Sequence, residues 1–155
     1  MAFYGRTLER GLTQQAWANI KQHLPEFIGT YAFEELCREW VLRQGDAGKL
    51  PFVPRRVGAH WGGKGPQVDV VAINEDAHAI LLGECKWQDQ TIGRATVKGL
   101  VEKAPMVVPG PLDRWAVYYA FFSKSGFTEE ARHEMAGKQT FWIDLDDLDR
   151  ALREE

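Results

Sequence analysis

The sequence predicts an α/β fold in which a central mixed β-sheet is flanked by helices. The first observation is the order of segments with the hydrophobic periodicity of helices or strands, which is helix, three strands, helix, strand, helix, strand, helix. The second is the segment 114–123, which is apolar on both faces, as a central strand is. The third is a chain of 155 residues with 45 % hydrophobic and 26 % charged residues, which is typical of one globular domain. We therefore expect a single domain over 1–155.

Two amphipathic segments begin the chain. Residues 7–24 carry apolar side chains at helical spacing, and Pro25 is expected to end that helix. A second helix is predicted over 29–44, where one apolar stripe precedes a glycine-containing turn. The stripe consists of Phe33, Leu36, Cys37, Trp40 and Val41. We divide the domain into a helical lead-in, 1–28, and a core, 29–155.

Three strands are expected next, over 52–60, 67–74 and 78–87. The first is expected at a sheet edge, because prolines such as Pro54 cannot donate a ladder hydrogen bond. The short link between the second and third strands suits a hairpin turn. The second and third strands should therefore be antiparallel neighbours.

The remaining segments alternate between helix and strand. A helix over 94–107 is expected to be cut or bent near Pro105, and a helix over 127–137 is expected to start near Thr128. Strands are predicted over 114–123 and 139–144, and a last helix over 146–153.

Charge and cysteine content narrow the classes of function. The net charge of −3 and the pI of about 5.8 count against a nucleic-acid partner. The acids gather in the tail, however, so a basic face is compatible with an acidic total. The basic residues of the middle are Arg55, Arg56, Lys64, Lys86, Arg94, Lys98 and Lys103. Two cysteines build neither a disulfide framework nor a four-cysteine zinc site, and no segment has the apolar length of a membrane span. We expect free thiols, a cytoplasmic location and no membrane partner.

Charged side chains continue the apolar rows of two predicted strands. Alternation places Glu84 and Lys86 on the face that also carries Ile80 and Leu82. It likewise places Asp69 on one face with Gln67, Val71 and Ile73. A buried carboxylate requires a partner or a metal ion, because desolvation costs several kcal/mol. If the two strands pair through the short turn, Asp69 and Glu84 lie at similar heights, where a cation would compensate both.

The first core helix offers a third acid. Glu34 lies about a quarter-turn from the centre of the apolar stripe, so its side chain reaches the core edge. Glu35 points nearly opposite the stripe, and we expect it in water.

These residues resemble a known superfamily. Asp69, fourteen intervening residues and then Glu84-Cys85-Lys86 are similar to the PD-(D/E)XK nuclease signature, and Glu34 resembles the helix glutamate of that superfamily. The element order resembles the restriction-endonuclease-like fold. A closer likeness is to the domain of unknown function at the C-terminus of archaeal-type AAA ATPases. The segments that carry this likeness are Phe27-Ile28-Gly29, Phe33-Glu34, Trp61-Gly62, Val68-Asp69-Val70-Val71 and Gly83-Glu84-Cys85-Lys86-Trp87.

The resemblance implies metal-dependent hydrolysis of phosphodiester bonds in DNA by an endonuclease or a resolvase-like enzyme. The ligands of Mg²⁺ or Mn²⁺ would be Asp69, Glu84, Glu34 and the backbone carbonyl of Cys85. Lys86 would orient the attacking water and offset developing charge, and Gln88 would help to position that water. The nucleic-acid contacts would come from Arg55, Arg56, Lys64, Arg94 and Lys98.

The sequence departs from the family pattern in one place, because Gln67 stands where the ATPase-associated family often carries an acid. Three other readings therefore stay open. In the first, Glu84 and Lys86 form a structural pair at a sheet edge. In the second, the chain is a weak or inactive nuclease-like module that either binds nucleic acid or regulates an AAA ATPase. The ATPase would belong to the same chain or to another one, and the acidic C-terminal helix would be the contact surface. In the third, it is a non-catalytic dimerisation domain with its aromatic residues at a homodimer interface.

The glycine-rich segment 58–65 almost fits a phosphate-binding P-loop. Gly65 and Pro66 follow Lys64 where a Ser or Thr and a helix are required, so we reject nucleotide binding there. The loop remains a candidate contact for a nucleic-acid backbone, or a solvated surface. Trp61 and Trp87 would either stack on bases or pack in the core.

Overall fold

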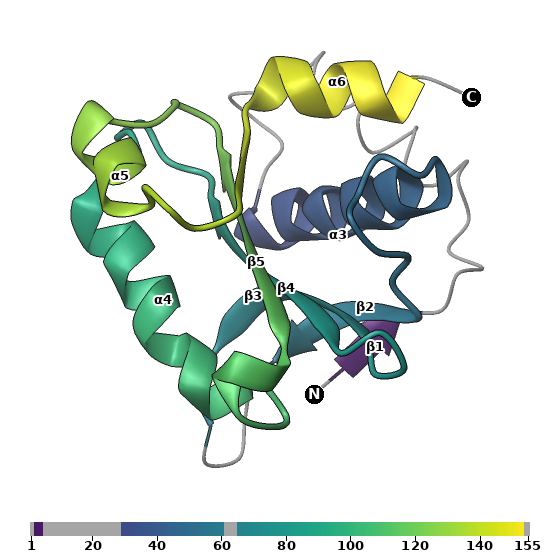
Figure 1. Cartoon of the computed structure of the whole chain (residues 1–155). Helices are drawn as coiled ribbons and strands as arrows, with labels where there is room; N and C mark the ends of the chain where they lie inside the picture. Colours follow the sequence, from purple (N-terminus) through teal and green to yellow (C-terminus); the bar gives the residue numbers. More distant parts are fainter. Residues whose placement is uncertain (1, 5–28, 61–64, 154–155) are drawn as a thin grey trace.

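The computed structural model describes residues 2–4, 29–60 and 65–153, and within these ranges a six-stranded mixed sheet forms the centre of the fold (Figure 1). The strands lie in chain order: β1 (Ala2–Tyr4), β2 (Arg56–His60), β3 (Val68–Asn74), β4 (Ala79–Lys86), β5 (Ala116–Ser123) and β6 (Thr140–Ile143). The pairs β1–β2, β2–β3 and β3–β4 are antiparallel, whereas β5 is parallel to both β4 and β6. The expected α/β architecture with one mixed sheet is confirmed.

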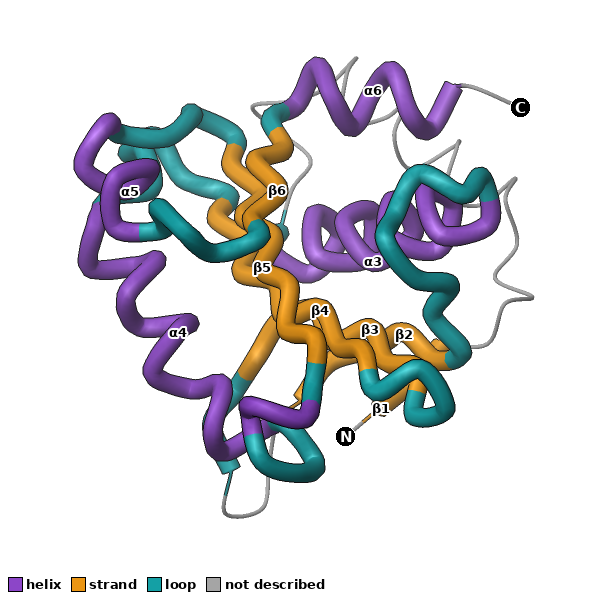
Figure 2. Tube along the Cα trace, in the orientation of Figure 1, coloured by secondary structure: helices purple, strands orange, loops and turns teal. Residues whose placement is uncertain are grey.

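Helices cover both faces of the sheet. One face carries α3 (Thr30–Asp46) and α6 (Leu145–Arg153), and the other carries α4 (Arg94–Val107) and α5 (Glu129–Glu134), with the short 3₁₀ turn η1 (Leu112–Arg114) before β5 (Figure 2). Each face has its own apolar cluster. The α3 side of the sheet includes Val70, Ala72, Leu81 and Phe122, and the α4 side includes Val71, Ile73, Leu82 and Phe121. The sheet is thus buried between two layers.

The helix stripe and the central strand are confirmed. Phe33, Leu36, Cys37, Trp40 and Val41 are all buried on α3. Tyr118, Tyr119, Phe121 and Phe122 of β5 are also buried, in alternation between the two clusters, because β5 has neighbours on both sides. These four aromatic residues therefore belong to the core of the chain, and a homodimer interface built from other aromatic residues stays a prediction.

The first predicted strand was too long and wrongly placed at an edge. Residues 51–55 are not a strand, and β2 begins at Arg56, since Pro54 has no N–H for a ladder. Pro54 instead packs on Gly45 of α3, where an added Cβ would lie 2.6 Å from the proline Cδ. β2 lies between β3 and β1, and the three residues of β1 are too few to show a strand period in the sequence.

The later elements lie where they were predicted, although α5 is shorter than the helix expected over 127–137. α4 spans the predicted residues and continues two residues beyond Pro105, so the helix is not cut there. Thr128 caps α5 by accepting a hydrogen bond from the N–H of Ala131, at 3.0 Å. The predicted helix over 7–24 lies outside the described residues. No helix in the ranges that the structure describes is both long and apolar enough to span a membrane.

Candidate functional site

A β-bulge in β3 shapes the site. Gly58 of β2 pairs with Val71, but His60 pairs with Val68, so β3 carries one extra residue between these pairs. The bulge places Val68 in the α4-side cluster, together with Val71 and Ile73. The simple alternation predicted for 67–73 is therefore wrong, because Val68 and Val71 lie on the same side of the sheet although they are three positions apart.

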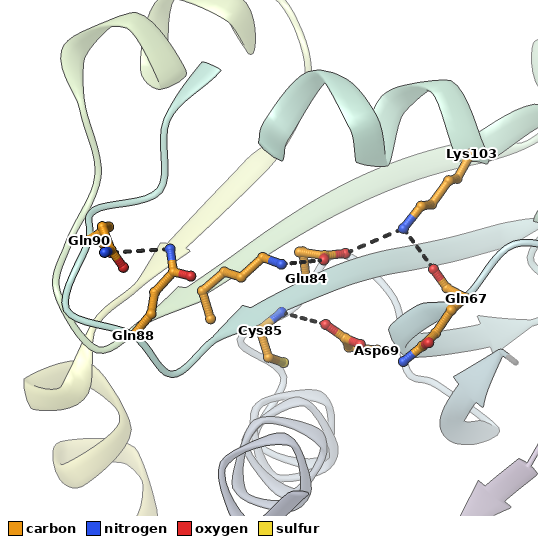
Figure 3. A network of polar contacts seen from close by, with 8 residues as sticks. Gln67, Asp69, Glu84, Cys85, Gln88, Gln90 and Lys103 are labelled. Atoms are coloured by element: carbon orange, nitrogen blue, oxygen red, sulfur yellow. Dashed lines mark hydrogen bonds and ion pairs between the residues drawn. The ribbon is translucent and has the colours of Figure 1, made fainter. Parts of the chain in front are cut away.

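Asp69 is held at the point where β3 and β4 separate. Their regular pairing reaches Val70 opposite Gly83, and beyond it the Asp69 carboxylate takes the place of a ladder acceptor. Its Oδ2 accepts a hydrogen bond from the backbone N–H of Cys85 at 2.9 Å (Figure 3). The backbone carbonyl of Asp69 accepts from Nη1 of Arg38 at 2.7 Å. Two contacts outside the β-ladder thus hold the side-chain carboxylate and the backbone carbonyl of Asp69, which is only 8 % exposed.

Glu84 lies between two lysines. Its Oε1 is 3.4 Å from Nζ of Lys86, on the same strand, and its Oε2 is 3.9 Å from Nζ of Lys103, which reaches across from α4 (Figure 3). The predicted parity of β4 is confirmed, because Ile80 and Leu82 pack on the α4 side of the sheet. Burial and then the nearby Asp69 carboxylate raise the pKa of Glu84, although both lysines oppose the shift.

Glu34 approaches from the opposite layer, on α3. Burial raises the pKa of Glu34, and the nearby carboxylates of Asp69 and Glu84 raise it further, while the Arg38 guanidinium opposes the shift. Glu35 was expected in water, but its side chain is only 24 % exposed and pairs with buried Arg38 at 3.2 Å. Arg38 needs a carboxylate partner because its guanidinium is buried.

These side chains line one cavity of about 360 Å³. The cavity brings together all six residues predicted for the catalytic and metal site: Glu34, Asp69, Glu84, Cys85, Lys86 and Gln88. Three further residues complete its wall: Gln67, Trp87 and Lys103. The side-chain amide of Gln88 donates to the carbonyl of Gln90 at 3.3 Å (Figure 3). Residues from β3, β4, α3 and α4 thus converge at one end of the β3–β4 hairpin.

Cys85 and Trp87 have structural roles in this wall. Cys85 is 3 % exposed, and burial raises its thiol pKa well above 9.0, as expected for a small core residue rather than a nucleophile. Trp87 packs against the ring of Phe33 at 5.2 Å between centroids, and Lys124 lies 5.0 Å from the Trp87 ring centroid. Of the two roles considered for Trp87, the structure shows packing against the core.

The residues predicted to contact nucleic acid are not gathered at the cavity. Arg55 and Arg56 lie at the opposite end of the sheet, paired with Asp76 and Glu75 of the β3–β4 turn. Arg94 pairs with Glu134 of α5 at 3.0 Å, and Lys98 is exposed on α4. Lys64 and Trp61 lie outside the described residues. The role of these basic residues stays a prediction.

The donor set fits a hard divalent cation. Three carboxylates from three elements line one cavity, and Asp69 raises the pKa of both Glu34 and Glu84, which is the repulsion that a bound cation relieves. Among the residues described, no three His, Cys, Asp or Glu side chains already form a coordination cluster. Lys86 and Lys103 instead hold Glu84. Metal binding here requires a rearrangement of side chains around Glu84.

Sequence reasoning missed two residues of the site. Arg38 is one helical turn after Glu34, so both side chains point in the same direction from α3. An arginine that is buried on the apolar side of a helix indicates a specific partner for its charge. Lys103 adjoins the buried stripe of α4, next to Ala104. No local pattern shows that α4 crosses the sheet beside Glu84.

Comparison with known proteins places the chain in a family. A family described as archaeal and bacterial proteins of unknown function, DUF234, matches residues 3–98, which is more than half of the chain. The chain belongs to the DUF234 family. The DUF234 match includes Glu34, Asp69, Glu84 and Lys86 and ends before Lys103. An uncharacterized protein of Methanocaldococcus jannaschii is 28 % identical over 107 residues, which are 68 % of this chain and 23 % of that protein. The chain therefore spans about a quarter of the length of that relative.

Solved structures with some likeness include three endonucleases. The modification-dependent restriction endonuclease AspBHI has a TM-score of 0.47 and 16 % identity, over 93 % of this chain and 34 % of its own. The restriction endonuclease MspJI, solved with a 27-mer oligonucleotide, has a TM-score of 0.46 and 14 % identity, over 92 % and 30 %. A repair endonuclease from Pyrococcus abyssi has a TM-score of 0.42 and 15 % identity, over 57 % and 38 %. At TM-scores below 0.5, these likenesses alone establish neither a shared fold nor a shared activity.

Proposed function

We propose that this chain is a metal-dependent phosphodiesterase that hydrolyses DNA at the cavity between α3, α4 and the end of the β3–β4 hairpin. The observation that carries the proposal is the convergence of Glu34, Asp69, Glu84 and Lys86 on one cavity from α3, β3 and β4. Acids that destabilise one another in a shared cavity are typical of a functional site rather than of a surface ion pair. The restriction-endonuclease-like family that the signature resembles uses this combination of residues for the same chemistry.

Each residue has a role that follows from its position. Asp69 and Glu84 would be the main ligands of Mg²⁺ or Mn²⁺, with the Cys85 carbonyl and Glu34 as further donors. The bound ion would lower the pKa of a water molecule and neutralise the phosphate. Lys86 shares its strand face with Glu84, so its ammonium group would orient the attacking water and offset charge in the transition state. Gln88 lines the same wall and would hold that water.

The protein also restrains the geometry of the acids. The Cys85 N–H holds one carboxylate oxygen of Asp69, and Arg38 holds the Asp69 carbonyl. Asp69 is therefore positioned before any cation arrives, which lowers the reorganisation required at the reaction step. Arg38 acts through Asp69 and is a positioning residue.

The direct test is metal binding followed by cleavage. Calorimetric titration of the wild-type chain with Mn²⁺ should show binding at millimolar metal or below, and Lys86→Ala should keep this binding while losing DNA cleavage. Lys138→Ala, an exposed lysine of the turn before β6, is the matched control and should keep both. No Mn²⁺ binding by the wild type, or full cleavage by Lys86→Ala, would exclude the proposal.

A second candidate function is a nuclease-like module that binds nucleic acid or regulates an AAA ATPase without cutting. The observation that favours it is that the chain corresponds to about a quarter of its longer relative. The pairing of Glu84 with two lysines also favours a site with weak metal affinity. DNA binding by the wild type with no cleavage in either Mg²⁺ or Mn²⁺ would select this function. The DNA partner, an ATPase partner, a homodimer and a cytoplasmic location all stay predictions.

A further inference from the structure

Lys103 occupies a fixed place on the cavity wall that the proposed chemistry does not yet use. Its Nζ donates a hydrogen bond to the backbone carbonyl of Gln67 at 2.8 Å and lies 3.9 Å from Oε2 of Glu84 (Figure 3). The contact with Glu84 is too long for a hydrogen bond. A lysine ammonium has three donors, so Lys103 retains donors for an anion that enters the cavity.

The backbone under Lys103 is rigid. α4 is anchored to the sheet by Val97, Leu100 and Ala104, which are at most 1 % exposed, and Ala104 is the next residue along the chain. The carbonyl that holds the ammonium belongs to Gln67, one residue before β3 and two before Asp69. Lys103 therefore joins the rigid helix to the strand that carries the first acid, and its side chain is still 31 % exposed.

The charges of the cavity wall are nearly balanced. Ionised, the carboxylates of Glu34, Asp69 and Glu84 carry three negative charges, and Lys86 and Lys103 carry two positive ones. The other residues of the wall are neutral. One divalent ion together with one phosphodiester anion brings this wall to neutrality. Two divalent ions with the same anion would leave two excess positive charges in a partly buried cavity, which is costly.

We propose that Lys103 is a substrate-contacting residue of this site, supplying from α4 the positive charge that a second metal ion would otherwise supply, so that the cavity takes one divalent ion and one phosphodiester. Gln67 agrees with this arrangement, because its neutral side chain adds no further negative charge to the wall. The inference deepens the proposed function and rests on it.

The first experiment counts ions. Titration of the full chain with Mn²⁺, followed by calorimetry and by the electron paramagnetic resonance of free Mn²⁺, should give one bound ion per wild-type chain. Lys103→Gln should bind Mn²⁺ on the order of ten-fold more tightly, because a cation that competes for Glu84 is gone. Lys103→Glu should bind a second ion. Lys138→Gln removes the same charge far from the cavity and should leave the count and the affinity unchanged.

The second experiment measures contact with the phosphodiester. With Ca²⁺ in place of Mg²⁺, the affinity for a short DNA duplex is measured over a range of salt concentrations. Lys103→Gln should lower the slope of log affinity against log salt by about 0.9, which is the loss of one phosphate contact. Lys103→Arg should restore the wild-type slope, and Lys138→Gln should keep it. Circular dichroism and urea unfolding check that each variant folds.

The outcomes separate the two proposals. Two Mn²⁺ ions on the wild type, an unchanged Mn²⁺ affinity in Lys103→Gln, or an unchanged salt slope in that variant would each overturn the role of Lys103 while leaving a metal-dependent nuclease intact. Absence of any Mn²⁺ binding by the wild type would overturn both proposals together. The inference is supported if the wild type binds one Mn²⁺ ion, and if Lys103→Gln binds this ion more tightly and loses one phosphate contact with DNA.

Discussion

The two ends of the β3–β4 hairpin carry similar numbers of charges but place them in opposite environments. At the turn end, Arg55 pairs with Asp76 and Arg56 with Glu75, and these four side chains are between 43 % and 70 % exposed. At the cavity end, Asp69 is 8 % exposed and the Glu84 side chain 13 %. The same two strands thus end in a solvated set of ion pairs and in a cluster of partly desolvated acids.

The difference shows why only one end is a candidate for chemistry. Exposed pairs are screened by water and contribute little to stability, so nothing at the turn end is under electrostatic stress. At the cavity end, burial and mutual repulsion raise the pKa of Glu34 and Glu84 despite the nearby lysines. A bound cation would therefore stabilise the cavity end more than the turn end. Four predictions test this difference between the two ends of the hairpin.

The largest effect is expected from Glu84→Gln at the cavity end. If the chain is a metal-dependent nuclease, loss of this carboxylate should lower the rate of DNA cleavage on the order of 10³-fold, because the ion loses a principal ligand. The rate is measured with a labelled duplex in Mg²⁺. Glu75→Gln, at the turn end of the same hairpin, is the matched control and should cleave like the wild type. Equal rates in both variants would remove the distinction between the two ends.

The next effect is on folding stability. Arg38→Met leaves the Asp69 carbonyl and Glu35 without their guanidinium partner and should lower the free energy of unfolding by about 3 kcal/mol. Arg56→Met, which breaks an exposed pair, should lower it by less than about 0.5 kcal/mol. Urea unfolding at neutral pH measures both. A smaller loss in Arg38→Met than in Arg56→Met would contradict a restraint on Asp69.

A third effect is a pH dependence with a defined sign. The pKa of Glu84 is raised in the fold above its ordinary value of 4.5, so the folded state binds more protons than the unfolded state just above that pH. Glu84 therefore makes the free energy of unfolding fall as pH rises from about 4.5 through the raised pKa. Glu84→Gln should lose less stability than the wild type over that range, as followed by urea midpoints, and added Mn²⁺ should reduce the loss in the wild type. Parallel curves for the two proteins would show that Glu84 is not perturbed.

The smallest effect is expected from the double variant Arg55→Gln and Arg56→Gln. Both arginines are already paired with acids and lie away from the cavity, so the affinity for DNA should fall by less than about three-fold. Fluorescence anisotropy with a labelled duplex measures this affinity. A loss larger than that of Lys103→Gln would move the nucleic-acid surface to the turn end.

Much of the site was predictable because the direction of its side chains depends on the periodicity of a single strand or helix. Strand parity alone placed Glu84 and Lys86 on one face, and the helical period directed Glu34, rather than the less inward Glu35, to the cavity. Asp69 lines the predicted cavity, but the strict alternation expected along its strand does not hold. The bulge in β3 interrupts that alternation, and a bulge depends on how β2 pairs with β3, which no local pattern encodes.

The sequence by itself determined the α/β class, the buried stripe of α3 and the central position of β5, because each follows from alternation or helical spacing along one segment. The six predicted residues of the cavity were named by these periods together with the resemblance of their motif to a nuclease signature. Only the tertiary structure decided that Asp69 accepts from the Cys85 N–H, that Arg38 holds the Asp69 carbonyl, and that Lys103 faces Glu84. These contacts join residues between 16 and 31 positions apart. The first arises from how β3 pairs with β4, and the other two from how α3 and α4 pack on the two faces of the sheet. Strand pairing and helix packing are set by the whole core rather than by any local pattern.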